Sequence, residues 1–304
     1  GEKTAQDPGM IFRKALVLVC MAAIAACASA KPSTPAIWRV SDADNSLYLL
    51  GSFHALKPAD YPMSKAVEDA YNDAEQLVFE VSSEQLQSTE LAGKMLQAAQ
   101  LSDDTKLQNL LPEALWNSLR SWLDDHPEVP ETQLQQVKPW YAALLVVNSS
   151  ARAMGFHDEQ GLDQHFMGKA GKSAKPSRGL EQASQQIALF NNMPLPAQIE
   201  LLQEALQDPG AADRELDALH GAWKAGDVRL LERLTIDEMR GKYPDMYLAI
   251  NVQRNQAWLP QLQTMLDDEP EDDALVVVGA LHLLGPDGLV QQLQNRGYRV
   301  ERLK

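Results

Sequence analysis

The feature that most constrains the fold is a block that occurs twice, LYLLGSFH at 47–54 and LVVVGALH at 275–282. Each block is a short apolar run that ends in Gly-x-x-His, and each is followed by a loop, a helical segment and another strand-like segment. A short continuous apolar run is typical of a strand buried on both faces of a sheet. Strand–helix–strand units give parallel pairing, so the two ends of the chain are expected to build one central sheet.

Further strand-like segments lie at 37–40, 76–81 and 297–303. The turn-rich residues after the first of these join it to the first repeated block, which predicts a β-hairpin. Between about 84 and 268 the apolar residues recur at helical spacing, which predicts a large helical insertion between two βαβ-type halves. The fold class is therefore α/β (α+β), with a single domain over 31–304. The helices predicted in the insertion include 84–99, 140–154, 180–191 and 244–266.

The acidic composition limits the kinds of partner that the chain can bind. It has 27 Lys and Arg against 42 Asp and Glu, which gives a formal net charge of −15. Nucleic acids and anionic membranes need a dense positive surface, so neither is expected as the main partner. With 45% hydrophobic residues, the chain can bury an ordinary globular core.

Residues 1–30 have the pattern of an export signal rather than of a folded element. Met10 is the expected start, with residues 1–9 a leading scar or an over-extended start, and the basic Arg13 and Lys14 follow it. The apolar run 15–26 is too short to span a membrane, which takes about 20 residues. We therefore expect this segment to direct export.

Two cleavage patterns overlap at the end of that segment. ASA at 28–30 fits ordinary signal peptidase and would release a soluble protein. IAAC at 24–27 resembles a lipobox, which would leave Cys27 lipidated and the protein tethered as a periplasmic or outer-membrane lipoprotein. Both alternatives stay open. Cys20 and Cys27 are the only cysteines, so neither a disulfide nor a Cys-ligated metal is expected in 31–304.

The repeated turn also predicts a site. Gly51 and Gly279, directly after the two strands, permit a positive φ and close approach of the backbone. The chain then turns over the carboxyl edge of the sheet, where ligand sites of α/β folds lie, so His54 and His282 are expected to meet there. Glu80 ends a neighbouring apolar strand, where a carboxylate is costly unless it is paired or binds metal. Two His and one Glu suit a divalent cation that keeps open positions for water.

A set of short motifs runs along the chain: GSFH at 51–54, LVFE at 77–80, KPW at 138–140, GLD at 161–163, GLE at 179–181 followed by Gln185, RNxxW at 254–258 and VGALHLxG at 278–285. Together these motifs resemble the TraB/GumN family, which includes the animal TIKI proteins, over about 36–303. The resemblance implies a fold related to erythromycin-esterase-like and ChaN-like proteins. TIKI members are described as metal-dependent proteases that act on secreted signalling proteins.

Carried over residue by residue, the resemblance makes His54, His282 and Glu80 the candidate catalytic set and metal ligands. Arg254 and Asn255 become candidates for binding a substrate carbonyl or carboxylate, because a guanidinium offers a fixed fork of donors to an oxyanion. The alternative for Arg254 is a structural ion pair, for example with a glutamate.

Three further side chains, Ser52, Glu181 and Gln185, are expected to support the site. Glu181 and Gln185 are four residues apart in the predicted helix 180–191, so they would face the same way. Glu181 is also the expected partner if Arg254 forms an ion pair.

The chain is therefore expected to be an exported hydrolase that depends on a divalent metal such as Mn, Co or Zn, and the favoured activity is that of a peptidase. Its substrate would be a peptide or a small molecule. The alternative is a lipoprotein that binds haem, an iron complex or a peptide without catalysis, because paired imidazoles can also hold such ligands. The sequence does not indicate the metal identity or the oligomeric state.

Overall fold

The computed structural model describes residues 31–269 and 272–304; the predicted export segment and its two cleavage patterns lie outside these ranges. The strands of its sheet are β1 (Ile37–Ser41), β2 (Ser46–Ser52), β3 (Gln76–Val81), β4 (Ser177–Glu181), β5 (Ala274–Gly279) and β6 (Arg299–Leu303). Their order in the sheet is β4-β3-β5-β2-β1-β6. The predicted α/β fold class with one central sheet is confirmed.

Strands from the two ends of the chain alternate at the centre of the sheet. β1 and β2 form the predicted antiparallel hairpin, and β6 pairs antiparallel with β1 at the edge. β5 lies between β2 and β3 and is parallel to both. Ser52 of β2 lies opposite Gly279 of β5, so the two repeated blocks are neighbours and their Gly-x-x-His turns leave the sheet at the same carboxyl edge.

The predicted helix 180–191 is wrong at its start. Residues 177–181 form strand β4, which pairs parallel with β3, and helix α10 spans Ala183–Asn191. β4 is an edge strand whose first two residues are exposed, so it lacks the apolar run that marks a buried strand. The predicted helical insertion therefore also supplies one edge of the sheet.

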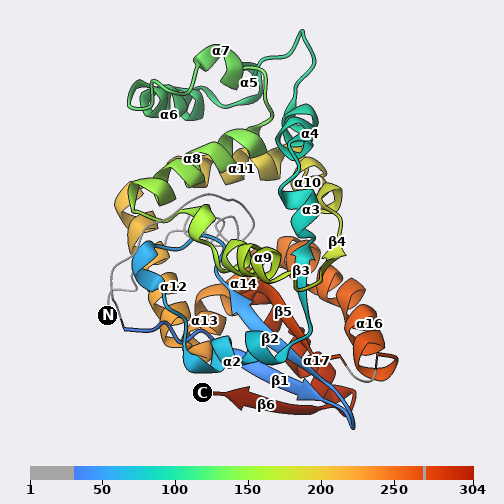
Figure 1. Cartoon of the computed structure of the whole chain (residues 1–304). Coiled ribbons are helices and arrows are strands. Elements are labelled where there is room, and N and C mark those ends of the chain that lie inside the picture. The colour runs from blue at the N-terminus through green and yellow to red at the C-terminus, as the bar shows by residue number, and fades with distance from the viewer. Residues whose placement is uncertain (1–30, 270–271) are drawn as a thin grey trace.

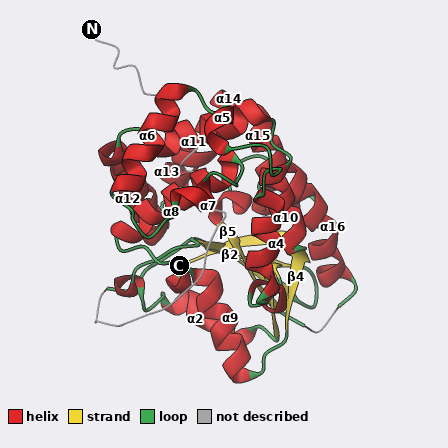
Figure 2. Ribbon diagram, turned by 90° about the horizontal axis from the view of Figure 1, so that it is seen from above, coloured by secondary structure: helices red, strands yellow, loops and turns green. Residues whose placement is uncertain are grey.

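Two pairs of helices pack close to the sheet. They are α2 (Lys65–Asp73) with α9 (Leu162–Ser173), and α16 (Gln253–Asp267) with α17 (Leu289–Asn295). Tyr71 of α2 stacks on Phe166 of α9, with ring centroids 5.6 Å apart, and Figure 2 shows both helices together on one side of the strands. α9 contacts β5, α17 contacts β1, and α16 contacts β4.

The remaining helices form a region that Figure 1 shows mostly above the sheet. Their bounds are α3 (Ser83–Leu86), α4 (Glu90–Ala99), α5 (Leu107–Leu110), α6 (Glu113–Asp124), α7 (Glu131–Leu134), α8 (Pro139–Ala153), α11 (Leu195–Leu206), α12 (Pro209–Ala225), α13 (Val228–Glu232), α14 (Glu238–Lys242) and α15 (Pro244–Tyr247). Helix α8 packs along α11, and buried apolar side chains from 99–147, together with Phe190, Leu201, Leu202 and Ala205, form a second cluster beside that of the sheet. The molecule thus has two packed cores, and the carboxyl edge of the sheet faces the helical one.

Short 3₁₀ and π-helical turns lie between the longer elements, and some predicted helices are divided. The 3₁₀ turns are η2 (Pro58–Asp60), η3 (Asp158–Gln160) and η6 (Ala280–Leu283), and the π-helical turns are η4 (Arg233–Asp237) and η5 (Leu248–Val252). The predicted helix 244–266 is therefore α15, η5 and α16 in succession, and 84–99 is α3 followed by α4. In the described ranges, no helix combines the length and apolar character needed to cross a membrane.

Candidate functional site

The two Gly-x-x-His turns and the end of β3 bring three side chains together. The Nε2 atoms of His54 and His282 each lie 3.7 Å from the same oxygen, Oε1 of Glu80. All three side chains are largely buried, with 14%, 4% and 10% of their surface exposed for His54, His282 and Glu80. The sheet register therefore places two imidazoles that are 228 positions apart in sequence around one carboxylate.

Gly279 leaves the space in which these three groups meet. A Cβ atom at this position would lie 3.1 Å from His54 Nε2 and 3.2 Å from Glu80 Oε1. The Gly279 N–H also donates a 2.8 Å hydrogen bond to Glu80 Oε1. Of the two properties that glycine permits here, neither Gly51 nor Gly279 uses a positive φ. Close approach is the property that the site requires of Gly279.

His54 is held by a carboxylate that comes from helix α9. Its Nδ1 lies 2.7 Å from Asp163 Oδ2, and the Ser52 hydroxyl donates to the same oxygen at 2.7 Å. Gly161 lets the start of α9 reach this turn, because a Cβ there would lie 2.2 Å from the His54 carbonyl oxygen. Burial disfavours the charged imidazole, but the negative charge and hydrogen bond of Asp163 outweigh it and raise the pKa of His54 to about 9.

His282 has a different set of partners. Its Nδ1 lies 2.8 Å from the Asn255 side-chain oxygen, and its Nε2 lies 3.1 Å from Nη1 of Arg254. Asn255 is held in turn, because its amide donates to the carbonyl oxygens of His282 and Asp287 at 3.2 and 2.9 Å. Burial and the adjacent guanidinium both disfavour a second positive charge and lower the pKa of His282 to about 3. This ring is therefore neutral, with Nδ1 as donor and Nε2 as acceptor.

Arg254 is fully engaged by groups of the chain itself. Nη2 donates to Glu80 Oε2 at 2.6 Å and to Glu181 Oε1 at 2.5 Å, and Nε donates to Glu181 Oε2 at 3.1 Å. Nη1 contacts the Ile250 carbonyl oxygen at 3.2 Å as well as His282. A guanidinium has five N–H donors, so the described contacts leave none for a substrate. The alternative prediction for Arg254, an ion pair with Glu181, is present in the structure.

The same guanidinium determines the charge of Glu80. Burial disfavours an ionised carboxylate, but Arg254 and the two imidazoles outweigh it and hold the pKa of Glu80 well below its usual range. Glu181 receives a further bond from the Trp258 indole N–H at 3.2 Å, so both glutamates are bound from several sides. Glu80 is therefore a fixed, ionised carboxylate between the two rings.

Gln186, not the predicted Gln185, is the glutamine that reaches the site. The Gln185 side chain caps the start of α10 by accepting from the Gln182 N–H at 2.7 Å, and it is exposed. Its neighbour Gln186 reaches the site and donates to Glu80 Oε2 at 3.0 Å and to Glu181 Oε1 at 2.9 Å. Glu181 itself supports the site from the end of β4, not from a helix.

The donor set fits a divalent cation in charge and chemistry. Counted as ionised, Asp163, Glu80 and Glu181 against Arg254 leave a net charge of minus two when both imidazoles are neutral. A cation held at about 2.0–2.2 Å needs donor atoms about 3.0–3.6 Å apart, so the 3.7 Å separations must close slightly. Within 31–269 and 272–304, no group of three His, Cys, Asp or Glu side chains is arranged to hold a metal ion.

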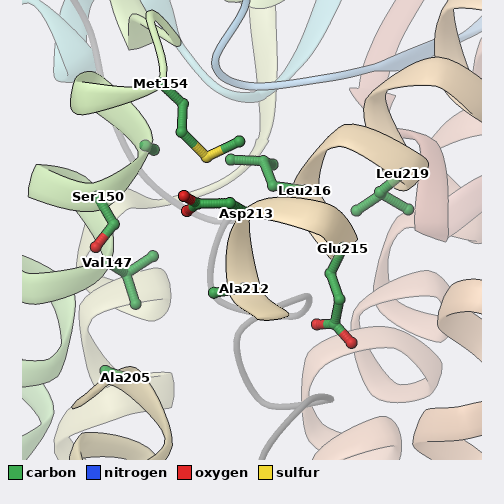
Figure 3. A pocket seen from close by; sticks show the side chains of 10 residues that line it. Val147, Ser150, Met154, Ala205, Ala212, Asp213, Glu215, Leu216 and Leu219 are labelled. Carbon is green, nitrogen blue, oxygen red and sulfur yellow. The ribbon is translucent and has the colours of Figure 1, made fainter. Parts of the chain in front are cut away.

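A cavity of about 310 Å³ adjoins the site and is lined by His54, Glu80, Asp163 and Gln186 together with apolar side chains. A much smaller cavity of about 40 Å³, between α8 and α12, shares none of these residues. Figure 3 shows the smaller one, with Met154 and Leu216 facing each other and the carboxylate of Asp213 beside them. It contains no histidine and gives no reason to place chemistry there.

The fold and these paired turns define an α/β protein whose candidate site lies at the carboxyl edge of its sheet. The model of the TraB/PrgY/gumN family matches residues 36–302, and the chain therefore belongs to that family. Curated relatives include the uncharacterized protein YbaP of Escherichia coli (strain K12) and of Shigella flexneri, each 28% identical over 160 residues. The match covers 51% of this chain and 56% of each relative, so the chain spans about half the length of the curated relatives that it matches. No solved structure matches the chain significantly.

Proposed function

We propose that the protein is an exported hydrolase that uses a divalent cation and cleaves peptide bonds. The observation that carries the proposal is the meeting of His54, His282 and Glu80 around the space left by Gly279. We propose the peptide bond as the bond that is hydrolysed because the family resemblance implies proteolytic activity. One divalent cation would neutralise the net charge of minus two that this cluster carries when both imidazoles are neutral.

His54, Glu80 and His282 would hold the cation through Nε2, Oε1 and Nε2. When bound, such a cation polarises a carbonyl group and makes a water molecule a better nucleophile near neutral pH. His282 Nε2 is the acceptor of an Arg254 bond, so that bond has to open for His282 to serve as a ligand. Mn, Co and Zn remain the candidate metals.

The surrounding residues orient the three ligands. Asp163 accepts from His54 Nδ1, so once His54 gives up its second proton to bind a cation, the free lone pair is on Nε2, toward Glu80. Asn255 accepts from His282 Nδ1 and leaves Nε2 of that neutral ring as the acceptor. Arg254 binds Glu80 Oε2 and so turns Oε1 toward the rings. We therefore assign positioning roles to Arg254 and Asn255 in place of the predicted substrate contacts.

The test is cleavage of a peptide library by the purified protein, read by mass spectrometry, with and without a chelator. We expect His54→Ala and His282→Ala each to abolish cleavage and to lower the amount of metal that copurifies. His126→Ala is the matched control, because His126 stacks on Trp122 and bonds to its carbonyl oxygen, and it does not line the cavity. Undiminished cleavage by both site variants would reject the assignment.

Export is the part of the proposal that rests on the sequence alone. Its support is the order of basic, apolar and small residues over 10–30. Sequencing the amino terminus of protein recovered from cell fractions tests it, together with Cys27→Ala. A mature amino terminus at Lys31 would support release as a soluble protein, whereas a blocked Cys27 in a membrane fraction would support a lipid anchor.

A further inference from the structure

The cavity beside the site combines reactive and apolar walls. His54, Glu80 and Asp163 are part of its lining. Its remaining walls come from helices α3, α4, α8, α9 and α10 and from the end of β3. At about 310 Å³ it is at the small end of the range of ligand cavities, which fits part of a substrate rather than a whole cofactor.

The apolar walls are side chains that the fold leaves partly uncovered. Large apolar residues from four helices line the cavity and are each only half-buried: Leu86, Leu91, Met95, Leu145 and Ile187. The buried Phe79 and Phe190 also line it. Apolar surface that faces a cavity gains free energy when an apolar ligand covers it. The arrangement therefore favours a bulky aliphatic or aromatic group.

Apart from His54, Glu80 and Asp163, the described polar side chains that line the cavity are uncharged. Tyr141, Asn148 and Gln164 line it, and no hydrogen bond of their side chains is recorded in the described part of the chain. None of the residues that line the cavity is Lys or Arg. Amide and hydroxyl groups match the donors and acceptors of a peptide backbone, whereas an acidic group would meet the Glu80 and Asp163 carboxylates.

From this geometry we infer that the cavity is the specificity pocket, which takes a bulky uncharged side chain of a peptide next to the bond that is cleaved. The inference rests on the proposed function for the cleavage step. In this arrangement the peptide backbone lies against Tyr141, Asn148 and Gln164. The carbonyl group of the bond that is cleaved lies beside His54 and Glu80. The inference predicts preference for Leu, Met or Phe, and rejection of Asp or Glu, at the residue in the pocket.

A second and larger cavity lies on the other side of helix α10. It measures about 670 Å³ and includes Leu189 as well as the charged Glu200, Lys242 and Asp245. None of the three proposed ligands lines it. Ile187 and Leu189 are thus half-buried neighbours on one helix that face different cavities, which supplies a matched control.

The experiment compares Ile187→Trp with Leu189→Trp, and adds Met95→Trp as a second way to fill the pocket from another helix. Circular dichroism and thermal unfolding establish that each variant is folded. Cleavage is measured on matched peptides that differ only in a Leu, Ala or Glu residue next to the scissile bond. Binding of the same peptides, labelled with a fluorophore, is measured in the His54→Ala background by anisotropy.

We expect the parent protein to cut the Leu peptide at least about tenfold faster than the Ala peptide, and the Glu peptide slowest. Ile187→Trp and Met95→Trp should each reduce the Leu-to-Ala ratio about tenfold, while Leu189→Trp should keep the parental ratio. A Leu-to-Ala ratio that neither pocket variant changes would overturn the inference and leave the proposed hydrolase intact.

The binding measurement distinguishes the specificity pocket from the proposed hydrolase when no cleavage is seen. If no peptide is cut, tighter binding of the Leu peptide that Ile187→Trp abolishes would support the pocket and reject the proposed hydrolase. If no peptide is cut and the Leu, Ala and Glu peptides bind alike, the specificity pocket is rejected as well.

Discussion

The two Gly-x-x-His turns share a sequence pattern and a place at the sheet edge, yet their histidines differ in almost every contact. His54 faces the cavity and is held by the carboxylate of Asp163. His282 is more deeply buried, is absent from the cavity lining, and is held by the neutral amide of Asn255. The repeat brings the rings together, but the partners determine what each ring can do.

The partners give the two rings opposite protonation behaviour. Burial disfavours the charged form of both, yet Asp163 raises the pKa of His54 to about 9, while Arg254 adds to the effect of burial and lowers the pKa of His282 to about 3. Trp258 also packs against His282, with ring centroids 4.4 Å apart, whereas no aromatic ring of residues 31–269 and 272–304 packs in this way against His54. One pattern in the sequence thus yields a cationic ring at the cavity and a neutral ring behind it.

The largest effect is expected from removing the guanidinium that distinguishes the second turn. Arg254→Met leaves Glu80 and Glu181 as buried carboxylates without their cation, so unfolding should become easier by about 3–5 kcal/mol. Chemical denaturation measures the loss. Arg178→Met is the control, because Arg178 pairs with Glu269 at the surface and should contribute about 0–1 kcal/mol. Equal losses in the two variants would contradict the role assigned to Arg254.

The glycines of the repeat provide the next comparison. In Gly51→Ala the new Cβ would lie 3.1 Å from the Ala280 Cβ and 3.2 Å from its Cα, so we expect a loss of about 1–3 kcal/mol from overpacking. In Gly279→Ala the new Cβ meets the ends of two side chains, His54 and Glu80, rather than backbone, so stability should fall less. Its main effect should be at least a tenfold loss of Zn²⁺ or Mn²⁺ affinity by calorimetry. Unchanged affinity in Gly279→Ala would show that the cation does not bind at this space.

A smaller effect is expected from changing Asp163, the carboxylate that accepts from His54. Asp163→Asn removes the charge that orients His54, and we expect the affinity for the cation to fall about 10- to 100-fold. Ser52→Ala removes only a hydroxyl donor to the same carboxylate, and it should cost less than tenfold. Calorimetric titration of both variants checks the order. A larger loss in Ser52→Ala would mean that the negative charge is not what matters.

Several site residues could be predicted because each lies in a local pattern. The repeated block identifies His54 and His282, and the apolar run before Glu80 indicates a buried carboxylate. The prediction that failed depended on an element boundary. Helix α10 begins at Ala183, not at residue 180, so Glu181 and Gln185 do not lie on one helix. Successive residues of a helix point about 100° apart, so Gln185 and Gln186 face different directions. Gln185 was therefore chosen where Gln186 reaches the site.

Asp163 was given no role because only tertiary structure creates one. It lies 109 residues from His54 in the sequence, at the start of a helix whose approach depends on Gly161. The motif GLD at 161–163 is visible in the sequence, and its combination of a glycine with an acidic residue at a helix start was the available signal. Strand β4 was missed because its polar residues carry no alternation that distinguishes an edge strand from a loop.

The smallest effect concerns the residue before His54 in the first turn. Phe53 packs edge-on against His220, with ring centroids 5.8 Å apart, and His220 Nε2 lies 2.9 Å from Oδ2 of the buried Asp60. Burial disfavours the charged carboxylate, but the hydrogen bond from His220 and the backbone bond from Lys57 outweigh it and keep the pKa of Asp60 below its ordinary value. Because a lowered pKa stabilises the fold above the ordinary Asp value, this contribution is present at neutral pH and is lost as the pH falls through the lowered pKa.

Asp60→Asn should therefore lower the free energy of unfolding at pH 7 by about 1 kcal/mol, since it removes the charge from these bonds. The difference from the parent protein should begin to shrink below about pH 4, where Asp60 of the unfolded chain becomes protonated while folded Asp60 still keeps its charge. Asp69→Asn is the control, because Asp69 forms an exposed i, i+4 pair with Lys65 that should contribute little at any pH. Urea unfolding of the three proteins between pH 3 and pH 7 measures both curves. A gap between Asp60→Asn and the parent that stays constant over this range would mean that the Asp60 charge does not stabilise the first turn.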